Sequence, residues 1–389
     1  MSVETITLGC RLNFAESETI RRLATAEDDW VVVNSCAVTN EAVRQTRQAI
    51  RRSRRERPTS RILVTGCAVE LDPKAFEAMP EVDRVIGNDN KIGSLGGDAQ
   101  VAPAGFLGHV RSFVAVQTGC DHRCTFCSIW QARGPSRSLP FEAIRDAVVR
   151  ELQRGAREIV LTGVDITSYC HDGVGLGELC QRLLASVPAL TRLRLSSLDS
   201  IEIDDALFEL IAGDPRLMPH FHLSLQAGDD MILKRMKRRH SRAQAVATIE
   251  RIKQASPDAT IGADLIAGFP TETEEMALNS LKLLDDCDII AAHVFPFSPR
   301  PKTPAERMPQ LTRDVVKARA ARLRAAASER RSRWLDGLQG STLPTLIENN
   351  GKGHSDSFAP VAIAGAIRGQ TGKALITGRE GDHLTAAWA

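Results

Sequence analysis

The N-terminal third of the chain alternates short apolar runs with stretches of helical pattern. VETITL alternates like a half-buried strand, and WVVV and ILV are short enough to be buried strands. The strands are expected at residues 3–8, 30–33 and 62–64, and helices at 16–26 and 40–57. This order predicts an N-terminal open α/β sheet domain over residues 1–100.

A second strand-and-helix pattern follows a Gly-, Ala- and Pro-rich segment at 98–109, which is typical of a linker. Its expected strands are 113–117, 158–163, 192–197, 220–226, 260–269 and 291–297, with helices such as 141–154, 230–237 and 241–255 between them. Repeated units of this kind predict an incomplete (β/α)6 barrel over residues 110–335. Their strand ends, Gly163, Ser197, Gln226 and Phe269, should share one rim, where such barrels carry their sites. Thr271 to Glu274 fits a capping box for the helix that follows.

The C-terminal part changes character after a long basic helix at 312–336. Beyond Gly340, short apolar segments are separated by Gly and Asn turns. They predict a small β-barrel at residues 336–389, of a kind that often binds nucleic acid and that is small enough to need docking against its neighbours.

Composition narrows the class of protein. The 389 residues suffice for two or three domains, and they contain no run of eighteen apolar residues. The first residues, MSVETITLGCRLN, do not have the pattern of a signal peptide. We therefore expect a cytoplasmic protein without a membrane partner, in which clustered cysteines indicate metal binding or catalysis rather than disulfides.

The net charge is only +2, but positive charge is concentrated in a few segments. Residues 44–57 contain seven arginines and one acid, and residues 234–240 and 313–333 are also basic. Such patches either follow a phosphate backbone or are solvated helix faces. The candidates for nucleic-acid contact are Arg51, Arg52, Arg54 and Arg55, the arginines of 319–333 and the terminal barrel.

Three cysteines far apart in the sequence each follow one of the first predicted strands. Cys10, Cys36 and Cys67 end the stretches LGC, NSC and TGC. The carboxyl ends of parallel strands meet at one edge of a sheet, so these thiols are expected to converge.

A second trio, Cys120, Cys124 and Cys127, lies within eight residues. A structural zinc site would need a fourth ligand, and His122 between the first two cysteines is poorly placed to supply it. A cubane iron–sulfur cluster held by three thiolates keeps one iron open for a ligand. The trio therefore favours an open [4Fe-4S] cluster over zinc. The other cysteines, Cys170, Cys180 and Cys287, have no partner spacing and are expected to be core or incidental thiols.

The second trio stands in CDHRCTFC, which resembles the signature of the radical S-adenosylmethionine superfamily. LGCRLN, NSCAVT and TGCAVE resemble the cysteine motifs of the methylthiotransferase family, and the domain order matches that family through to a TRAM-like terminal barrel. The resemblance implies two [4Fe-4S] clusters, one on each trio, and S-adenosyl-L-methionine as cofactor.

Further motifs of the barrel carry the same resemblance. TGVD, the serine pair SS, SLQAGDD and DLIAGFPTETEE resemble family segments. They imply contacts to the cofactor from Gly163, Asp165, Ser197, Gln226 and Asp264. This chain departs from the family pattern at Thr271 and Lys302, where glycine is usual.

The resemblance implies a radical reaction on tRNA. GCRLN and TGVDITSY are most similar to the subfamily that methylthiolates C2 of N6-threonylcarbamoyladenosine at position 37, with two molecules of S-adenosylmethionine. It implies a reductant such as flavodoxin or ferredoxin and leaves the sulfur donor open. The alternatives are isopentenyl-adenosine tRNA or a ribosomal protein as substrate, and a non-catalytic iron–sulfur RNA-binding protein. Arg133 and Arg300 are the candidates for binding the threonylcarbamoyl carboxylate, against structural ion pairing or cofactor contact.

Overall fold

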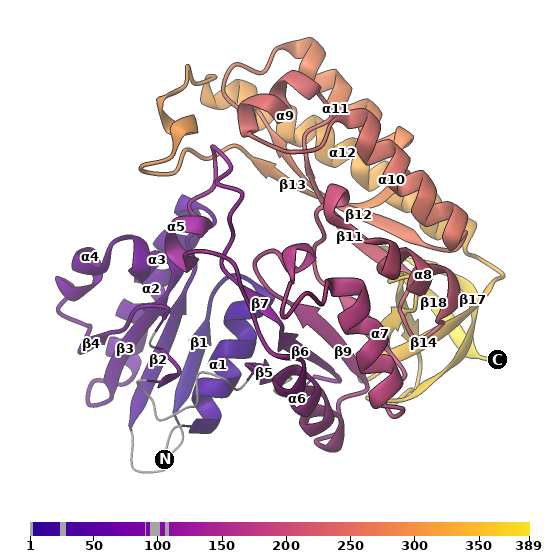
Figure 1. Ribbon diagram of the computed structural model, residues 1–389, viewed down its shortest axis with the longest axis horizontal. Coiled ribbons are helices and arrows are strands. Elements are labelled where there is room, and N and C mark those ends of the chain that lie inside the picture. Colours follow the sequence, from indigo (N-terminus) through magenta and orange to yellow (C-terminus); the bar gives the residue numbers. More distant parts are fainter. Residues whose placement is uncertain (1–2, 24–28, 90, 94–101, 106–108) are drawn as a thin grey trace.

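The computed structural model describes residues 3–23, 29–89, 91–93, 102–105 and 109–389. It is a mixed α/β protein in which an N-terminal sheet, an open barrel and a closed terminal barrel follow one another along the chain (Figure 1). Most of the predicted linker at 98–109 lies outside the described residues. Its described part includes a short strand, β5 (Ala104–Gly105), which pairs with the first barrel strand.

The N-terminal sheet is parallel throughout, in the order β1-β2-β3-β4. Its strands are β1 (Glu4–Thr7), β2 (Trp30–Ser35), β3 (Arg61–Gly66) and β4 (Arg84–Val85), with helices α1 (Arg11–Leu23), α2 (Asn40–Glu56), α3 (Cys67–Leu71) and α4 (Pro73–Glu77). The apolar runs of β2 and β3 are buried. Helix α1 begins at Arg11, five residues before the predicted start at residue 16, so it follows Cys10 directly.

The central unit is an incomplete barrel of parallel strands. These are β6 (Arg111–Ala115), β9 (Glu158–Thr162), β10 (Leu193–Leu195), β11 (His220–Gln226), β12 (Thr260–Ala267) and β13 (Ile289–Pro296). Bridges at Leu193–Leu217 and Leu198–Leu223 join the two halves of the sheet between β10 and β11. The mixed α/β class is thus as expected, and the strands and helices follow one another in the predicted order.

Helices cover the outside of the barrel. They are α6 (Phe141–Gln153), α7 (Leu176–Ser186), α8 (Asp205–Gly213), α9 (Asp230–Met236), α10 (Arg242–Ala255), α11 (Glu274–Asp286) and α12 (Arg313–Gly337). The predicted capping box at Thr271 is wrong: Thr273 is the N-cap of α11, and Thr271 lies two residues earlier with a φ of +67°. The hydroxyl of Thr273 accepts from the Met276 amide, which satisfies a donor that the helix leaves free.

Strand alternation gives the barrel an apolar outer face and a polar inner face. Val114, Leu161 and Leu223 are buried against the helices. The residues between them point inward, and the pattern of β11 alternates strictly between buried and half-buried. The interior is therefore lined with charged and aromatic side chains, unlike the apolar filling of a closed eight-stranded barrel.

The C-terminal strands form a closed barrel in the order β14-β15-β16-β18-β17. The strands are β14 (Thr342–Asn349), β15 (Lys352–Ser355), β16 (Pro360–Ile363), β17 (Thr371–Glu380) and β18 (His383–Trp388). β15 is short and polar, so the apolar segments of the sequence do not predict it. As expected for so small a unit, the terminal barrel docks against the central barrel. Phe358 stacks on His220 at 5.0 Å, and Thr260 donates to the Ser357 carbonyl at 2.7 Å.

Among the described residues, no helix is both long and apolar enough to cross a membrane.

Candidate iron–sulfur and cofactor site

The loop from Gly119 to Cys127 holds the second cysteine trio at the upper rim of the barrel. Gly119 has a φ of +80°, and a Cβ on it would lie 1.8 Å from the Pro135 carbonyl oxygen, so only glycine fits. The amide of Thr125 donates to the Met236 carbonyl at 3.0 Å, which ties the loop to the end of α9. The loop geometry is therefore fixed from both sides.

The three thiols of this trio act on one another electrostatically. Burial, followed by Asp165 and the neighbouring thiols, raises the pKa of Cys120 to about 12. Burial and then Cys124 raise the pKa of Cys127 to about 11. Such thiols ionise readily only when a cation compensates the charge, as metal ligation does.

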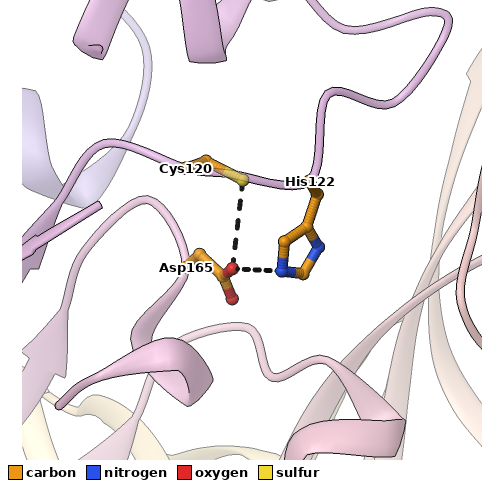
Figure 2. Close-up of side chains that lie close together, drawn as sticks. All are labelled: Cys120, His122 and Asp165. Carbon is orange, nitrogen blue, oxygen red and sulfur yellow. Dashed lines mark hydrogen bonds and ion pairs between the residues drawn. The ribbon is translucent and has the colours of Figure 1, made fainter. Parts of the chain in front are cut away.

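His122 points toward acids of the barrel rim, and one of its ring nitrogens lies within 4.8 Å of Cys120 Sγ. Figure 2 shows the imidazole and the Cys120 thiol converging on Asp165. His122 Nε2 lies 2.8 Å from Asp165 Oδ2, and Cys120 Sγ lies 3.9 Å from the same oxygen. Hydrogen bonds to Asp165 and Glu202 raise the pKa of His122 to about 10. The imidazole is therefore a cation among carboxylates, which does not suit it to complete a zinc site with these thiols.

A cavity of about 410 Å³ opens beside this rim. Its lining comprises Asp121, His122, Ser168, Glu202, Lys237 and Arg239. Acids and bases alternate around it, which suits a zwitterionic ligand.

Four of the five predicted cofactor residues lie at strand ends near this rim. Gly163 and Asp165 follow β9, Ser197 follows β10, and Gln226 ends β11 with a φ of +70°. At Gly163 a Cβ would lie 2.7 Å from the Gln117 carbonyl oxygen, so the position requires glycine.

Asp264 is placed differently from the other four. It stands within β12, three residues before the strand ends, which corresponds to roughly 10 Å below the rim. Its Oδ1 lies 3.0 Å from His222 Nε2 and 3.2 Å from His293 Nδ1. The structure thus separates Asp264 from the rim residues and pairs it with two histidines of neighbouring strands.

The first trio converges at the carboxyl edge of the N-terminal sheet. Cys36 follows β2, Cys67 begins α3, and Cys10 precedes α1. A Cβ on Gly9 would lie 2.7 Å from Cys36 Sγ, so glycine lets the two loops approach. Burial, with a smaller contribution from Cys10 and Cys67, raises the pKa of Cys36 to about 11.

The second trio lies close to the first. Figure 1 shows α5 (Ile129–Arg133), which follows Cys127, beside α3 of the N-terminal sheet. Arg133 at the end of α5 donates from Nε to Cys67 Sγ at 3.2 Å, and Asn88 donates to the Ala132 carbonyl at 2.6 Å. Donor sets from two separate sheets are therefore brought together by α5.

Arg133 was one of two candidates for binding a substrate carboxylate, but its guanidinium is occupied by other residues of the chain. It is buried, and its guanidinium binds both Glu16 oxygens, at 2.5 and 3.0 Å. Its Nη2 also donates to Asn13 at 2.5 Å and its Nε to Cys67 Sγ at 3.2 Å. The alternative that Arg133 makes a structural ion pair is the one that holds. Arg300 is only 5% exposed, and it donates to Asn40 at 2.5 Å.

Sequence reasoning gave no role to Arg238, which donates to Cys124 Sγ at 3.6 Å and to Asp199 at 2.9 Å. The basic run at 234–240 contained it, but nothing distinguished it from its neighbours. The sequence also predicted that Arg54 contacts tRNA. In the structure its guanidinium donates instead to the carbonyls of Pro58, Ser60 and Glu81. Cys180 and Cys287 are buried in the barrel core, in line with a structural role.

The residues present fit two iron–sulfur clusters. Each trio offers three soft thiol ligands, the type that iron–sulfur clusters take. Donors surround the sulfurs: the amides of Val38 and Ile129 point at Cys36 and Cys127, at 3.5 and 3.3 Å. Together with Arg133 and Arg238, these groups would stabilise the negative charge of thiolates that bind a cluster.

Two family models match the chain. The model described as the radical SAM superfamily matches residues 114–284, and the one described as uncharacterized protein family UPF0004 matches residues 2–87. The first model covers the barrel from β6 to α11, and the second covers the N-terminal sheet.

Curated relatives align over nearly the full chain. The chain is 43% identical to threonylcarbamoyladenosine tRNA methylthiotransferase MtaB of Rickettsia prowazekii, over 98% of this chain and 96% of the relative. The protein of the same name from Bacillus subtilis is 30% identical over 92% of this chain and 89% of its own length. A tRNA-2-methylthio-N(6)-dimethylallyladenosine synthase of Cereibacter sphaeroides is 32% identical over 89% and 87%.

Among solved structures, the radical S-adenosylmethionine methyltransferase TsrM of Kitasatospora setae matches with a TM-score of 0.54 and 14% identity. The match covers 74% of this chain and 68% of that one. It supports the radical SAM fold alone.

Proposed function

From the premise that this chain belongs to the radical SAM tRNA methylthiotransferase family and is a transferase, we propose that it methylthiolates C2 of N6-threonylcarbamoyladenosine at position 37 of tRNA. The proposal includes two [4Fe-4S] clusters and two molecules of S-adenosylmethionine for each product. The observation that carries it is the closeness of two three-cysteine donor sets, which α5 joins through the hydrogen bond from Arg133 to Cys67 Sγ.

Cys120, Cys124 and Cys127 would hold the radical cluster. When bound, that cluster would supply the one electron that cleaves S-adenosylmethionine to methionine and a 5'-deoxyadenosyl radical. A radical route is needed because the hydrogen at C2 of adenine is not acidic enough for a side-chain base near neutral pH.

The upstream trio, Cys10, Cys36 and Cys67, would hold the auxiliary cluster, whose role is to present the sulfur that is transferred. The protein's task is then positioning: it keeps cofactor, target base and sulfur source in one enclosed space and excludes stray hydrogen donors. Gly163, Asp165, Ser197 and Gln226 are proposed to orient the cofactor at the rim.

The subclass rests on two supports. GCRLN has the form typical of the threonylcarbamoyl-adenosine subfamily, and the relative with 43% identity carries that activity in its name. Relatives named as dimethylallyladenosine synthases reach 32% identity, so the isopentenyl substrate is the alternative to be tested.

The experiment offers the anaerobically reconstituted enzyme two tRNAs that differ only at position 37. We expect methylthiolation of the threonylcarbamoyl form and none of the isopentenyl form, measured by nucleoside mass spectrometry. The reverse result would leave the family assignment and overturn the substrate.

Two triple variants test the clusters separately. Replacing Cys120, Cys124 and Cys127 by Ala should leave about half of the iron and abolish cleavage of S-adenosylmethionine. Replacing Cys10, Cys36 and Cys67 by Ala should also leave about half, with cleavage retained and thiolation lost. Full iron content in the upstream variant would contradict the auxiliary cluster. Absence of cleavage in the unaltered enzyme would favour a non-catalytic RNA-binding protein.

A further inference from the structure

The floor of the barrel interior is occupied by ion pairs that hold the terminal barrel in place. Glu158 on β9 binds Arg111, Arg192 and Arg194 from the neighbouring strands. Arg111 also reaches Glu348 of the terminal barrel at 2.7 Å. These guanidinium groups are therefore matched by carboxylates and serve the fold.

Arg11 is different from these arginines. It is the first residue of α1 and directly follows Cys10. Its guanidinium stands 5.8 Å above the ring of Phe113, which lies on the inner face of β6. Helix α1 lies across the barrel wall at this point, because Thr19 accepts a hydrogen bond from the Ala104 amide of β5 at 3.2 Å.

The contact with Phe113 shows which way Arg11 faces, because that ring lies on β6 of the barrel. The charged groups that act on Arg11 most, Arg111, Arg194, Asp264 and Glu158, belong to four different strands of the same barrel, in agreement with this contact. The side chain thus points into the barrel interior while remaining exposed to solvent. Among the residues that the structure describes, no carboxylate lies within 4.0 Å of it.

Three other arginines near the cysteine trios are already occupied. Arg238 donates to Asp199 at 2.9 Å. Arg133 is bound by Glu16, and Arg300 is buried against Asn40. Arg11 therefore has three properties that none of these arginines has in combination. It is accessible, it has no carboxylate partner in the described part of the chain, and it is covalently next to an expected ligand of the auxiliary cluster.

We propose that Arg11 binds the carboxylate of the threonylcarbamoyl substituent and so selects this substrate; the inference rests on the proposed function. A guanidinium can hold a carboxylate through two parallel hydrogen bonds. Because Arg11 is fixed next to Cys10, the same contact would orient the adenine relative to the sulfur source. An apolar isopentenyl group would instead desolvate Arg11 without a partner, which disfavours that substrate.

The test uses anticodon stem-loops that carry either threonylcarbamoyl-adenosine or its carboxamide analogue at position 37. Binding to the reconstituted enzyme is measured by fluorescence anisotropy at one salt concentration. We expect the unaltered enzyme to prefer the acid over the amide by about tenfold to a hundredfold, the range for a hydrogen-bonded charge pair. Arg11→Gln should bind the two RNAs equally, and Arg11→Lys should keep a reduced preference.

Arg182→Gln is the matched control, because Arg182 is an exposed arginine on α7 that pairs with Glu178 on the same helix. It should keep the full preference. Iron content and the electron paramagnetic resonance spectra of both clusters should be unchanged in Arg11→Gln. If that variant loses iron, Arg11→Lys with full iron content provides the comparison.

The outcomes separate the two proposals. If the unaltered enzyme methylthiolates the threonylcarbamoyl form but Arg11→Gln keeps the preference for the acid, the inference on Arg11 is wrong and the proposed function stands. Equal binding of acid and amide by the unaltered enzyme would also overturn it. If only isopentenyl tRNA is modified, the proposed function fails, and the role of Arg11 with it.

Discussion

Replacement of Arg133 by Met should unlock the N-terminal sheet from the radical-cluster loop. Arg133 ends α5, six residues after Cys127, and its guanidinium is buried between Glu16 and Cys67. The change removes a cation from a buried cluster in which Glu16 also binds Lys91. The carboxylate is then left with one cation in place of two.

The magnitude follows from the ionisation of Glu16. Burial alone would raise the pKa of this carboxyl, but Arg133, followed by Lys91, outweighs burial and lowers the pKa from its ordinary 4.5 to about 2. That interval corresponds to about 3 kcal/mol of folding free energy, of which Arg133 has the larger share. The lost hydrogen bonds to Asn13 and Cys67 add about 1 kcal/mol each. We therefore expect a loss of roughly 3–5 kcal/mol, as for other broken buried pairs.

The assay is amide hydrogen exchange on protein prepared without iron, read by mass spectrometry. Protection of α1 and α5 should fall by roughly two to three and a half orders of magnitude in Arg133→Met, while β12 keeps its protection. Arg133→Lys should lie between. Arg182→Met, which breaks an exposed pair, should change protection by less than about 1 kcal/mol.

The pH dependence has a definite sign. A carboxyl whose folded pKa is lowered stabilises the fold fully above its unfolded value and loses this contribution as pH falls. The contribution of Glu16 should thus be complete above pH 4.5 and vanish toward pH 2, and Glu16→Gln should flatten acid unfolding in this window. A loss under 1 kcal/mol in Arg133→Met, or one spread equally over β12, would refute the reasoning.

Other parts of the chain give further predictions. Arg51 and Arg52 are more than half exposed and pair only loosely with acids. Reversing their charge should weaken tRNA binding and make the plot of log binding constant against log salt shallower by up to about 2, with the iron content unchanged. An unaltered slope would assign both arginines to a solvated helix face. Thr271→Gly should raise the free energy of unfolding by about 1 kcal/mol, because a β-branched residue is held at a φ of +67°. Lys302→Gly, at a φ of +66°, should raise it by less, because lysine is not β-branched. Thermal denaturation that ranks the two variants in the opposite order would count against backbone strain. The Phe358 ring stacks on His220 and His354. Phe358→Ala should therefore weaken docking of the terminal barrel by about 2 kcal/mol and speed proteolysis between α12 and β14. An unchanged cleavage rate would show that the ion pairs alone hold the terminal barrel in place.

Much of the fold was already present in local patterns. Buried strands such as 30–33 and 62–64 and the helices between them follow from apolar periodicity, which depends on neighbours a few residues apart. The convergence of Cys10, Cys36 and Cys67 could be predicted because parallel strands bring their carboxyl ends to one edge. The short spacing of Cys120, Cys124 and Cys127 likewise carried its chemistry without any tertiary information.

What the sequence left undecided are contacts between side chains far apart along the chain. Arg133 and Arg300 looked alike as candidates for a substrate carboxylate. Only the packing of α5 against the N-terminal sheet brings Glu16, 117 residues away, to Arg133 and removes that cation from the site. No local pattern encodes such a pairing, because its energy depends on burial and on a partner chosen by the fold.

Backbone conformation and helix starts likewise depended partly on the sequence and partly on the tertiary structure. Thr271 and Lys302 stood out in the sequence as departures from a glycine pattern, but their positive φ values were decided by the turns that the packed elements require. Helix α1 began earlier than its apolar pattern indicated, which placed Arg11 on the helix and over Phe113. The sequence by itself therefore determined the elements, the two cysteine motifs and the family. The tertiary structure decided which charged groups hold the units together and left Arg11, among others, accessible beside the barrel, since electrostatic pairing in a protein is fixed by distance and burial rather than by order along the chain.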